Sequence, residues 1–367
     1  MDSFLSDDKK ILVFCLDDGR VLFRQNEKEE TKVASLTKIM TVWLALEEKN
    51  LGEKIIVNDE MLKGLDDFVV AGLKAGQEIS IEELAYLSML PSAGDAAQAL
   101  AIATAGSIEK FVEKMNARAK ELELGHTHFS NVVGFDEENY SSAEDIGKIL
   151  ERALKNPEFK KIFESFDFYA PSLDKVYKKT FEKSGAILGG KTGFTYEAGR
   201  NLASTALVND ANLMVVDLNE AWSTNNHIEN TLKIYDYLGE NYTMRKILDD
   251  GDRIAKITVK DSAKKELEIF ATETILRFLR NDEELVYEYD GVNEIDKNFG
   301  LGDFLGTYKI STEESGVLYE TNLWLEEEIE FYPYWLWNTL VGATLTFLVG
   351  FLVVKWRKHK CVRRRGR

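Results

Sequence analysis

Five serine residues in the chain are followed three positions later by a lysine, a spacing that can support nucleophilic chemistry. Side chains three residues apart on a helix lie on one face, so the amine can take the proton of the hydroxyl when burial lowers the pKa of the lysine. The pattern is common, and at least four of the five pairs must be accidental. The pairs are Ser6/Lys9, Ser35/Lys38, Ser107/Lys110, Ser172/Lys175 and Ser262/Lys265.

The Ser35/Lys38 pair differs from the others because it opens an apolar segment. Residues 36–46 carry hydrophobic side chains at helical spacing, whereas the other four pairs lie among charged residues. A lysine that points into the fold loses its water, which favours the neutral, basic form. Taken alone, Ser35 is better explained as a helix cap, so the catalytic interpretation needs support from elsewhere in the sequence.

Two further segments supply polar groups to a common site. Ser92 lies within residues 91–97, at a predicted break between two helices, where a small hydroxyl is suited to relay a proton. Residues 190–193 place Gly-Lys-Thr-Gly at the end of a predicted strand. The edge of such a strand can pair with an extended peptide, while Lys191 and Thr192 hold a carboxylate.

The three segments, in this order, resemble the Ser-x-x-Lys, Ser-x-Asn and Lys-Thr-Gly signature of penicillin-binding proteins and serine β-lactamases. Residues 34–40, 127–131 and 191–195 narrow the resemblance to the low-molecular-mass D-alanyl-D-alanine carboxypeptidase family. The similarity covers roughly residues 8–330. A β-lactamase shares the three motifs, but the second domain and the membrane anchor predicted below favour the peptidase.

The resemblance implies acyl transfer without a cofactor. Ser35 would attack the D-Ala-D-Ala carbonyl of a peptidoglycan pentapeptide, with Lys38 as base and Ser92 passing a proton to the leaving D-alanine. Water would then hydrolyse the acyl-enzyme, and β-lactams would act as covalent inhibitors. The oxyanion hole would be formed by backbone N–H groups of Ser35 and Phe194. The substrate-binding residues implied by the resemblance are Lys191, Thr192, Gly193, Phe194 and His227.

Two positions depart from the family pattern. Gly94 stands where the family usually has the asparagine of Ser-x-Asn, and His227 falls where many members have an arginine that assists carboxylate binding. Gly94 leaves open a catalytically impaired homologue that only binds wall peptides. A DD-endopeptidase that cuts cross-links is the closest variant of the predicted activity. His126 and His128 lack a third clustered ligand, so no metal site is predicted.

The elements that must position these residues follow an order of strands, helices and strands. Residues 11–16 and 20–24 flank Asp17-Asp18-Gly19, which predicts a β-hairpin. Capping patterns at Ser80 and Ser142 begin two helices. Strands are predicted at 187–191, 201–208 and 212–218, and a last helix at 228–238. This order predicts an α+β fold with an antiparallel sheet, of the penicillin-binding/serine β-lactamase type by resemblance, in residues 1–245. Short alternating runs predict a small β-rich domain at 250–330.

The C-terminal segment has the pattern of a membrane anchor. Residues 335–354 are uncharged and mostly apolar, long enough as a helix to cross about 30 Å of hydrocarbon, so a transmembrane helix is predicted at 334–354. Basic residues cluster in the tail 355–367, which the positive-inside rule places in the cytoplasm, with the catalytic domain outside. Such an orientation calls for an export signal, and residues 1–8 lack its features. Either the sequence starts after a leader that was removed or wrongly assigned, or the chain is a tail-anchored cytoplasmic protein.

The charge balance argues against a nucleic-acid partner. The net charge is −17, and the residues before Phe331 contain 38 basic and 63 acidic side chains, a net charge of −25. Binding to phosphates needs a basic face, which such a body does not offer. The two cysteines, Cys15 and Cys361, do not support a disulfide framework.

Overall fold

The computed structural model describes residues 8–65, 68–135, 138–221, 227–333, 339, 343–349 and 351–352. The chain divides into two compact units, Met1–Met244 with Phe278–Asn281, and Arg245–Arg277 with Asp282–Arg367. The division lies next to the domain boundary expected from the sequence at residues 245–250. All of the predicted site residues belong to the first unit.

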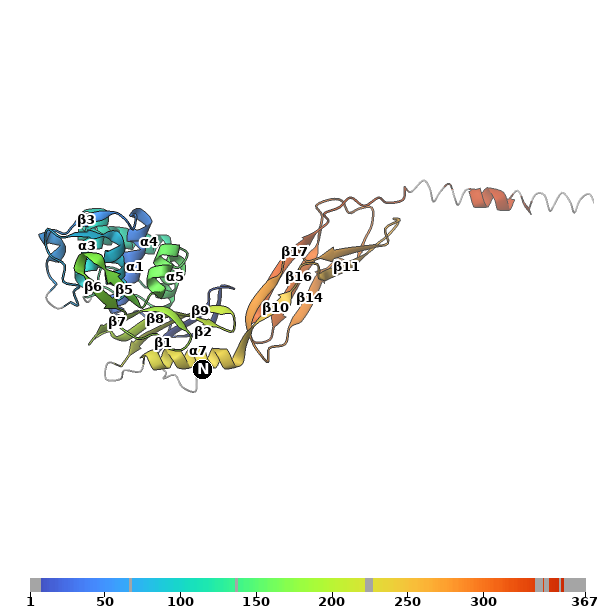
Figure 1. Ribbon diagram of the computed structural model, residues 1–367. Coiled ribbons are helices and arrows are strands. Elements are labelled where there is room, and N and C mark those ends of the chain that lie inside the picture. Colours follow the sequence, from blue (N-terminus) through green and yellow to red (C-terminus); the bar gives the residue numbers. More distant parts are fainter. Residues whose placement is uncertain are drawn as a thin grey trace, which may run out of the picture. The chain divides into compact units, whose positions relative to one another are not determined.

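A five-stranded antiparallel sheet forms the centre of the first unit (Figure 1). The N-terminal hairpin pairs through its first strand with the last of three later strands, which confirms the predicted sheet. The order is β2-β1-β9-β8-β7, so β7 is an edge strand. The strands are β1 (Lys10–Cys15), β2 (Arg20–Gln25), β7 (Ile187–Thr195), β8 (Gly199–Val208) and β9 (Ala211–Glu220).

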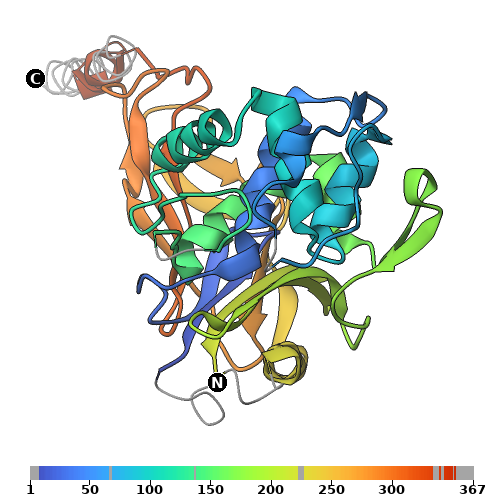
Figure 2. The ribbon, with the colours of Figure 1, turned by 90° about the vertical axis from the view of Figure 1, so that its left-hand side faces the viewer.

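Helices cover both faces of this sheet (Figure 2). On β1, Leu12 belongs to the large helical core, whereas Ile11 and Val13 belong to a second core with α7, because successive side chains of a strand point to opposite faces. The helices are α1 (Thr37–Glu48), α2 (Ile81–Met89), α3 (Gly94–Ala105), α4 (Ile108–Glu121), α5 (Ala143–Ala153), α6 (Pro157–Glu164) and α7 (His227–Asn241).

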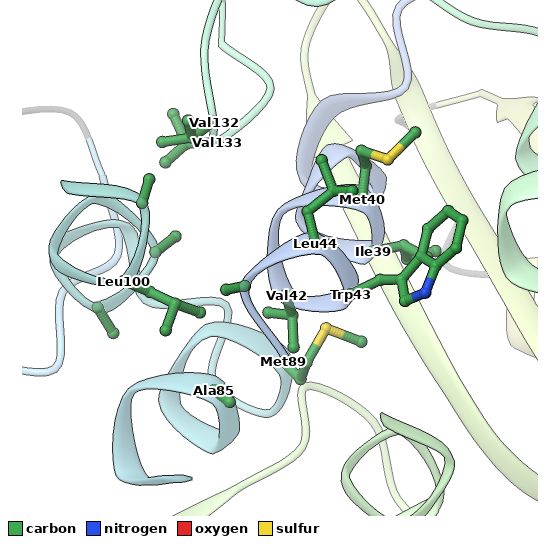
Figure 3. Packing of buried hydrophobic residues seen from close by; sticks show 14 of the residues in the cluster. Ile39, Met40, Val42, Trp43, Leu44, Ala85, Met89, Leu100, Val132 and Val133 are labelled. Atoms are coloured by element: carbon green, nitrogen blue, oxygen red, sulfur yellow. The ribbon is translucent and has the colours of Figure 1, made fainter. Parts of the chain in front are cut away.

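Helix α1 is surrounded by protein on all sides. Every residue from Thr37 to Leu46 is buried, as expected for a helix that is apolar around its circumference. Figure 3 shows its side chains among Ala85 and Met89 of α2, Leu100 of α3, and the segment that carries Val132 and Val133. A cation on such a helix has little access to water.

The helix starts predicted from capping patterns are confirmed. Ser80 and Glu83 form a reciprocal capping box at α2, and the Ser142 hydroxyl accepts the backbone N–H of Asp145 at α5. Short elements complete the first unit. They are η1 (Ala34–Leu36), β3 (Lys54–Ile56), η2 (Asp59–Leu62), β4 (Glu78–Ser80), β5 (Asp167–Ala170), η3 (Pro171–Leu173) and β6 (Lys175–Lys178).

The second unit is rich in β-strands, as the alternating runs predicted. Its two three-stranded sheets have the orders β12-β11-β15 and β14-β16-β17. A further pair of strands, β10 and β13, contains residues of both units. The strands are β10 (Tyr242–Leu248), β11 (Arg253–Val259), β12 (Glu266–Phe270), β13 (Ile275–Arg280), β14 (Val286–Gly291), β15 (Glu294–Ile295), β16 (Phe304–Thr312) and β17 (Gly316–Trp324).

The predicted transmembrane helix at 334–354 falls largely outside the described residues, as does the basic tail 355–367. Residues 343–349 of this segment are helical. Across the part of the chain that the structure describes, no helix combines the length and the apolar character needed to cross a membrane.

Candidate active site

The Ser35/Lys38 pair lies where the 3-10 turn η1 runs into α1. The Lys38 ammonium Nζ donates hydrogen bonds to Ser35 Oγ at 2.9 Å and to the carbonyl oxygen of Val133 at 3.2 Å. Only 1% of Lys38 is exposed. Burial lowers the pKa of Lys38 from 10.5 to about 7, so an appreciable fraction of the amine is neutral at physiological pH and can accept a proton.

The carbonyl that faces Lys38 is positioned by a tight loop. The Asn131 side-chain oxygen accepts the backbone N–H groups of Val133 at 3.0 Å and Gly134 at 2.6 Å. Gly134 has φ +91°, and a Cβ at this position would collide with the backbone carbonyl of Ala34. Glycine is therefore required here, and the loop packs directly against the turn that carries Ser35.

Two residues of the site have a backbone conformation that is rare for residues other than glycine. Ala34, which precedes the serine of η1, has φ +48°, and Ser92 has φ +65°. Each such conformation costs about 1–3 kcal/mol and persists only where packing enforces it. Ser92 lies between α2 and α3, at the helix break predicted from the sequence, and its hydroxyl accepts a hydrogen bond from Lys191 Nζ at 2.9 Å.

Lys191 on β7 is the second buried cation of the site. Lys191 is 1% exposed. Its Nζ also donates a hydrogen bond to the backbone carbonyl oxygen of Thr192 at 2.7 Å. Burial, followed by repulsion from Lys38 and Lys179, holds the pKa of Lys191 well below 10.5. The hydrogen bond between Lys191 and Ser92 joins residues that are 99 positions apart in the sequence.

Lys179 is a third buried lysine, and sequence reasoning missed it. Its Nζ donates to the carbonyl oxygens of Phe163 at 2.7 Å and Gly190 at 2.6 Å. Three aromatic rings lie within 6 Å of the same nitrogen, those of Phe163, Phe166 and Phe181. Burial lowers the pKa of Lys179 to about 7. The surrounding sequence is strongly charged, so no pattern indicates that this lysine is buried.

Gly193 lets β7 pass directly against η1. A Cβ at Gly193 would lie 2.5 Å from the carbonyl oxygen of Val33 and 3.2 Å from the backbone nitrogen of Ser35. No side chain fits in that space. The close approach brings the N–H of Ser35 beside the segment that contains Phe194. Next to it, the hydroxyls of Thr192 and Thr180 are hydrogen-bonded at 2.6 Å.

A cavity of about 550 Å³ opens onto these groups. Four of the residues predicted for the site line this cavity: Ser35, Lys38, Ser92 and Phe194. Lys191 is hydrogen-bonded to one of them, Ser92. The remaining lining is largely aromatic and aliphatic, with one ion pair at Lys32 and Glu197. It consists of Lys32, Ala34, Phe68, Val69, Val133, Gly134, Phe135, Thr195, Tyr196 and Glu197.

Phe68 occupies the space that a side chain at position 94 would need. Gly94 is the first residue of α3, and a Cβ there would lie 3.1 Å from Cβ and 3.3 Å from Cγ of Phe68. Phe68 in turn packs edge to face against Phe135, with ring centroids 5.1 Å apart. Gly94 does not have a positive φ. The glycine therefore fits the space that Phe68 leaves at this position, and the backbone conformation does not require it.

His227 is not among the described residues that line the cavity. It is buried at the start of α7, and burial, followed by the charges of Arg200 and Lys9, lowers its pKa to about 4. A neutral imidazole cannot supply the positive charge expected at this position. Arg200 pairs with Phe194 across β7 and β8, and its guanidinium carbon lies 4.9 Å from the Phe194 ring centroid. Arg200 is thus a cation beside the cavity that sequence reasoning missed.

The comparison with known proteins decides the family. A family model described as D-alanyl-D-alanine carboxypeptidase matches residues 6–221. The chain belongs to this family. The match spans the whole sheet and the residues that line the cavity, and His227 lies outside it.

Several curated relatives of this family are similar to the chain. D-alanyl-D-alanine carboxypeptidase DacF from Bacillus subtilis is 28% identical over 313 residues, which cover 82% of this chain and 78% of DacF. DacC from Escherichia coli is 33% identical over 215 residues, covering 54% of this chain and 53% of DacC. The match therefore spans about half the length of DacC.

Solved structures show that the fold extends beyond the family match. D-alanyl-D-alanine carboxypeptidase DacD from Francisella tularensis aligns with a TM-score of 0.73 at 18% identity, over 89% of this chain and 95% of DacD. A peptidoglycan synthesis regulatory factor from Streptococcus pneumoniae aligns with a TM-score of 0.70 at 22% identity, over 89% of this chain and all of that protein. At these identities, the alignments establish the penicillin-binding α+β fold alone.

Proposed function

We propose that the protein is a serine DD-carboxypeptidase that removes the terminal D-alanine from peptidoglycan stem peptides. The observation that carries the proposal is the 2.9 Å hydrogen bond between Lys38 Nζ and Ser35 Oγ, two residues that line the cavity. Both family membership and the names of the relatives support the substrate class.

In the proposed acylation step, Ser35 Oγ forms a bond to the carbonyl carbon of the penultimate D-alanine. Neutral Lys38 takes the hydroxyl proton and becomes an ammonium, which is feasible because its pKa is about 7. The negative charge that develops on the carbonyl oxygen would be stabilised by the backbone N–H groups of Ser35 and Phe194. Gly193 permits this arrangement, because any side chain there would push β7 away from Ser35.

The leaving nitrogen needs a proton when the peptide bond breaks. Ser92 lines the same cavity and accepts a hydrogen bond from Lys191, so we assign it the transfer of that proton from the Lys38 ammonium to the departing D-alanine. Lys38 is thereby returned to its neutral form. In the second step Lys38 takes a proton from water as the water oxygen attacks the acyl carbon. The ester bond to Ser35 Oγ then breaks, and the Lys38 ammonium returns the proton to Ser35, which releases the shortened peptide.

The end of β7 that carries Lys191 and Thr192 would hold the substrate carboxylate. Lys191 and Thr192 belong to β7, the edge strand of the sheet, where an extended peptide can add as a further strand. Arg200 provides a permanent positive charge one strand further in, beneath Phe194. In this chain Arg200 would assist binding of the substrate carboxylate, the role that the sequence predicted for His227.

The test uses labelling by a fluorescent penicillin and release of D-alanine from a pentapeptide. Wild-type protein should do both, and Ser35→Ala should do neither. Ser107→Ala is a matched control, because Ser107 belongs to another Ser-x-x-Lys pair but caps α4. Labelling that persists in Ser35→Ala would place the nucleophile elsewhere. A wild type inactive in both assays would favour a homologue that only binds wall peptides.

Endopeptidase activity is a second candidate, since a D-alanyl-D-alanine endopeptidase from Escherichia coli is 25% identical over 214 residues. The two activities are separated by supplying cross-linked dimers alongside pentapeptides. Cleavage of pentapeptides in clear preference to dimers supports the carboxypeptidase. The reverse preference would replace it with the endopeptidase.

We also propose that residues 334–354 anchor the protein in the cell membrane, with the catalytic domain outside and the C-terminus in the cytoplasm. The support is the uncharged stretch 335–354 followed by eight Lys and Arg residues and no acidic residue. External protease should release the acidic domain from intact spheroplasts of cells that express the protein. Full protection until the membrane is lysed would support a cytoplasmic orientation.

A further inference from the structure

An ion pair lines the same cavity as the candidate catalytic groups. Lys32 precedes η1, Glu197 lies in the turn between β7 and β8, and the Lys32 Nζ contacts a Glu197 carboxylate oxygen. The side chains are 29% and 66% exposed, so the pair lies at the open side of the cavity. The proposed acyl transfer does not use either charge.

The position of the pair relates to the direction of a bound peptide. If the terminal carboxylate lies at Lys191 and Thr192, the rest of an extended peptide runs along β7 toward Thr195 and the turn beyond it. Each residue advances by about 3.3 Å. The residue before D-Ala-D-Ala therefore lies about 7 Å from the terminal residue, near the end of β7 where Glu197 and Lys32 stand.

The two charges select among side chains by their complementarity. A solvent-exposed ion pair contributes only about 0–1 kcal/mol, so it opens readily for a better partner. A side chain that ends only in an ammonium would be attracted by Glu197 and repelled by Lys32. A side chain that ends only in a carboxylate would be attracted by Lys32 and repelled by Glu197. A side chain that ends in both groups can pair with Glu197 and Lys32 at once. A neutral side chain leaves the ion pair as it is.

We infer that the Lys32–Glu197 pair is a specificity site for stem peptides in which the residue before D-Ala-D-Ala has a side chain ending in both an ammonium and a carboxylate. The inference rests on the proposed carboxypeptidase function. It names the substrate class within it, and it assigns a role to two residues outside the three family motifs.

The test compares four acetylated X-D-Ala-D-Ala peptides with the full chain. X is diaminopimelate, lysine, 2-aminopimelate or norleucine, whose side chains end in both charges, an ammonium, a carboxylate and a methyl group, respectively. We expect kcat/KM for D-alanine release to be about tenfold higher with diaminopimelate than with norleucine, the size of one or two charge-assisted hydrogen bonds at an exposed site. Lysine and 2-aminopimelate should show no such advantage.

Variants identify the residues responsible. Glu197→Gln should reduce the ratio of kcat/KM for diaminopimelate over norleucine to about one and should favour 2-aminopimelate over lysine. Lys32→Met should also reduce the ratio of kcat/KM for diaminopimelate over norleucine to about one. This variant should favour lysine over 2-aminopimelate, the opposite of Glu197→Gln. The exposed Lys54–Glu78 pair offers a matched control, and Glu78→Gln should leave all four ratios as in the wild type. Each measurement is a ratio within one variant, so a loss of folded protein does not affect it.

The outcomes separate this inference from the proposed function. Equal release from all four peptides, or a diaminopimelate preference that survives both substitutions, would overturn the specificity site while leaving the carboxypeptidase intact. A wild type that neither releases D-alanine from any peptide nor is labelled by penicillin would overturn the proposed function itself. A preference that is lost in Glu197→Gln and kept in Glu78→Gln supports the inference.

Discussion

Replacing Lys38 by methionine should abolish acylation and at the same time stabilise the first unit at neutral pH. The lysine is fully enclosed on α1, and its pKa falls from 10.5 to about 7 because burial penalises the charged form. Methionine has a similar length and no charge, so it fills the space without that penalty. The trade of stability for a reactive group is common at active sites.

The magnitude follows from the shift in pKa. A change from 10.5 to about 7 corresponds, at 1.36 kcal/mol per unit, to a cost of about 4 kcal/mol at pH 7. Methionine forfeits the hydrogen bonds to Ser35 and Val133 and leaves a carbonyl oxygen without its donor, which costs about 2 kcal/mol. We therefore expect a net gain of about 2 kcal/mol in the free energy of unfolding at pH 7.

The gain must depend on pH in a definite direction. Between pH 7 and 10.5 the unfolded chain keeps a proton on Lys38 that the folded protein has released, so the stability of the wild type rises with pH in this window. The methionine variant lacks this dependence. Its advantage should shrink as pH rises and should reverse at about pH 9, where the remaining burial penalty of about 2 kcal/mol equals the cost of the lost hydrogen bonds. At pH 10 the variant should be less stable than the wild type.

The change in the free energy of unfolding is measured by urea unfolding at pH 7 and at pH 10. Hydrogen exchange of the α1 amides reports whether the change lies within the first unit. Lys110→Met is the matched control, because Lys110 belongs to an accidental Ser-x-x-Lys pair and is exposed on α4. It should change stability little and equally at both pH values. A Lys38→Met variant that is less stable than the wild type at pH 7 would refute the reasoning, since Lys38 would then carry no burial penalty.

Three further predictions concern the geometry of the site. Penicillin labelling should accelerate about tenfold between pH 6 and 8 as Lys38 loses its proton around pH 7, and a flat profile would exclude Lys38 as the base. Gly193→Ala should abolish labelling, because its Cβ would lie 2.5 Å from the Val33 oxygen; rapid labelling would show that β7 can move from η1 without loss. Gly94→Asn should slow D-alanine release, because Phe68 fills the space, and Phe68→Ala should restore it; slow release in the double variant would contradict this account.

Much of the fold was predictable because its signals are local. The N-terminal hairpin, the apolar helix after Ser35, the capped starts of α2 and α5 and the strands near the KTG motif all appear where the sequence predicted them. Periodicity and capping report on a few neighbouring residues, and those residues determine the element. The same locality explains why Ser35/Lys38 could be chosen from five pairs, since an apolar helix predicts burial.

The tertiary structure alone decided which groups meet at the site. The Lys191–Ser92 hydrogen bond joins residues 99 positions apart, and Phe68 faces Gly94 from a different segment. Lys179 is buried within a charged stretch, and the Arg200 guanidinium lies 4.9 Å from the ring of Phe194, which lines the cavity. The physical reason is common to all four. The desolvation and the close contacts that set a pKa or fill a cleft come from neighbours distant in sequence, and no local pattern records them.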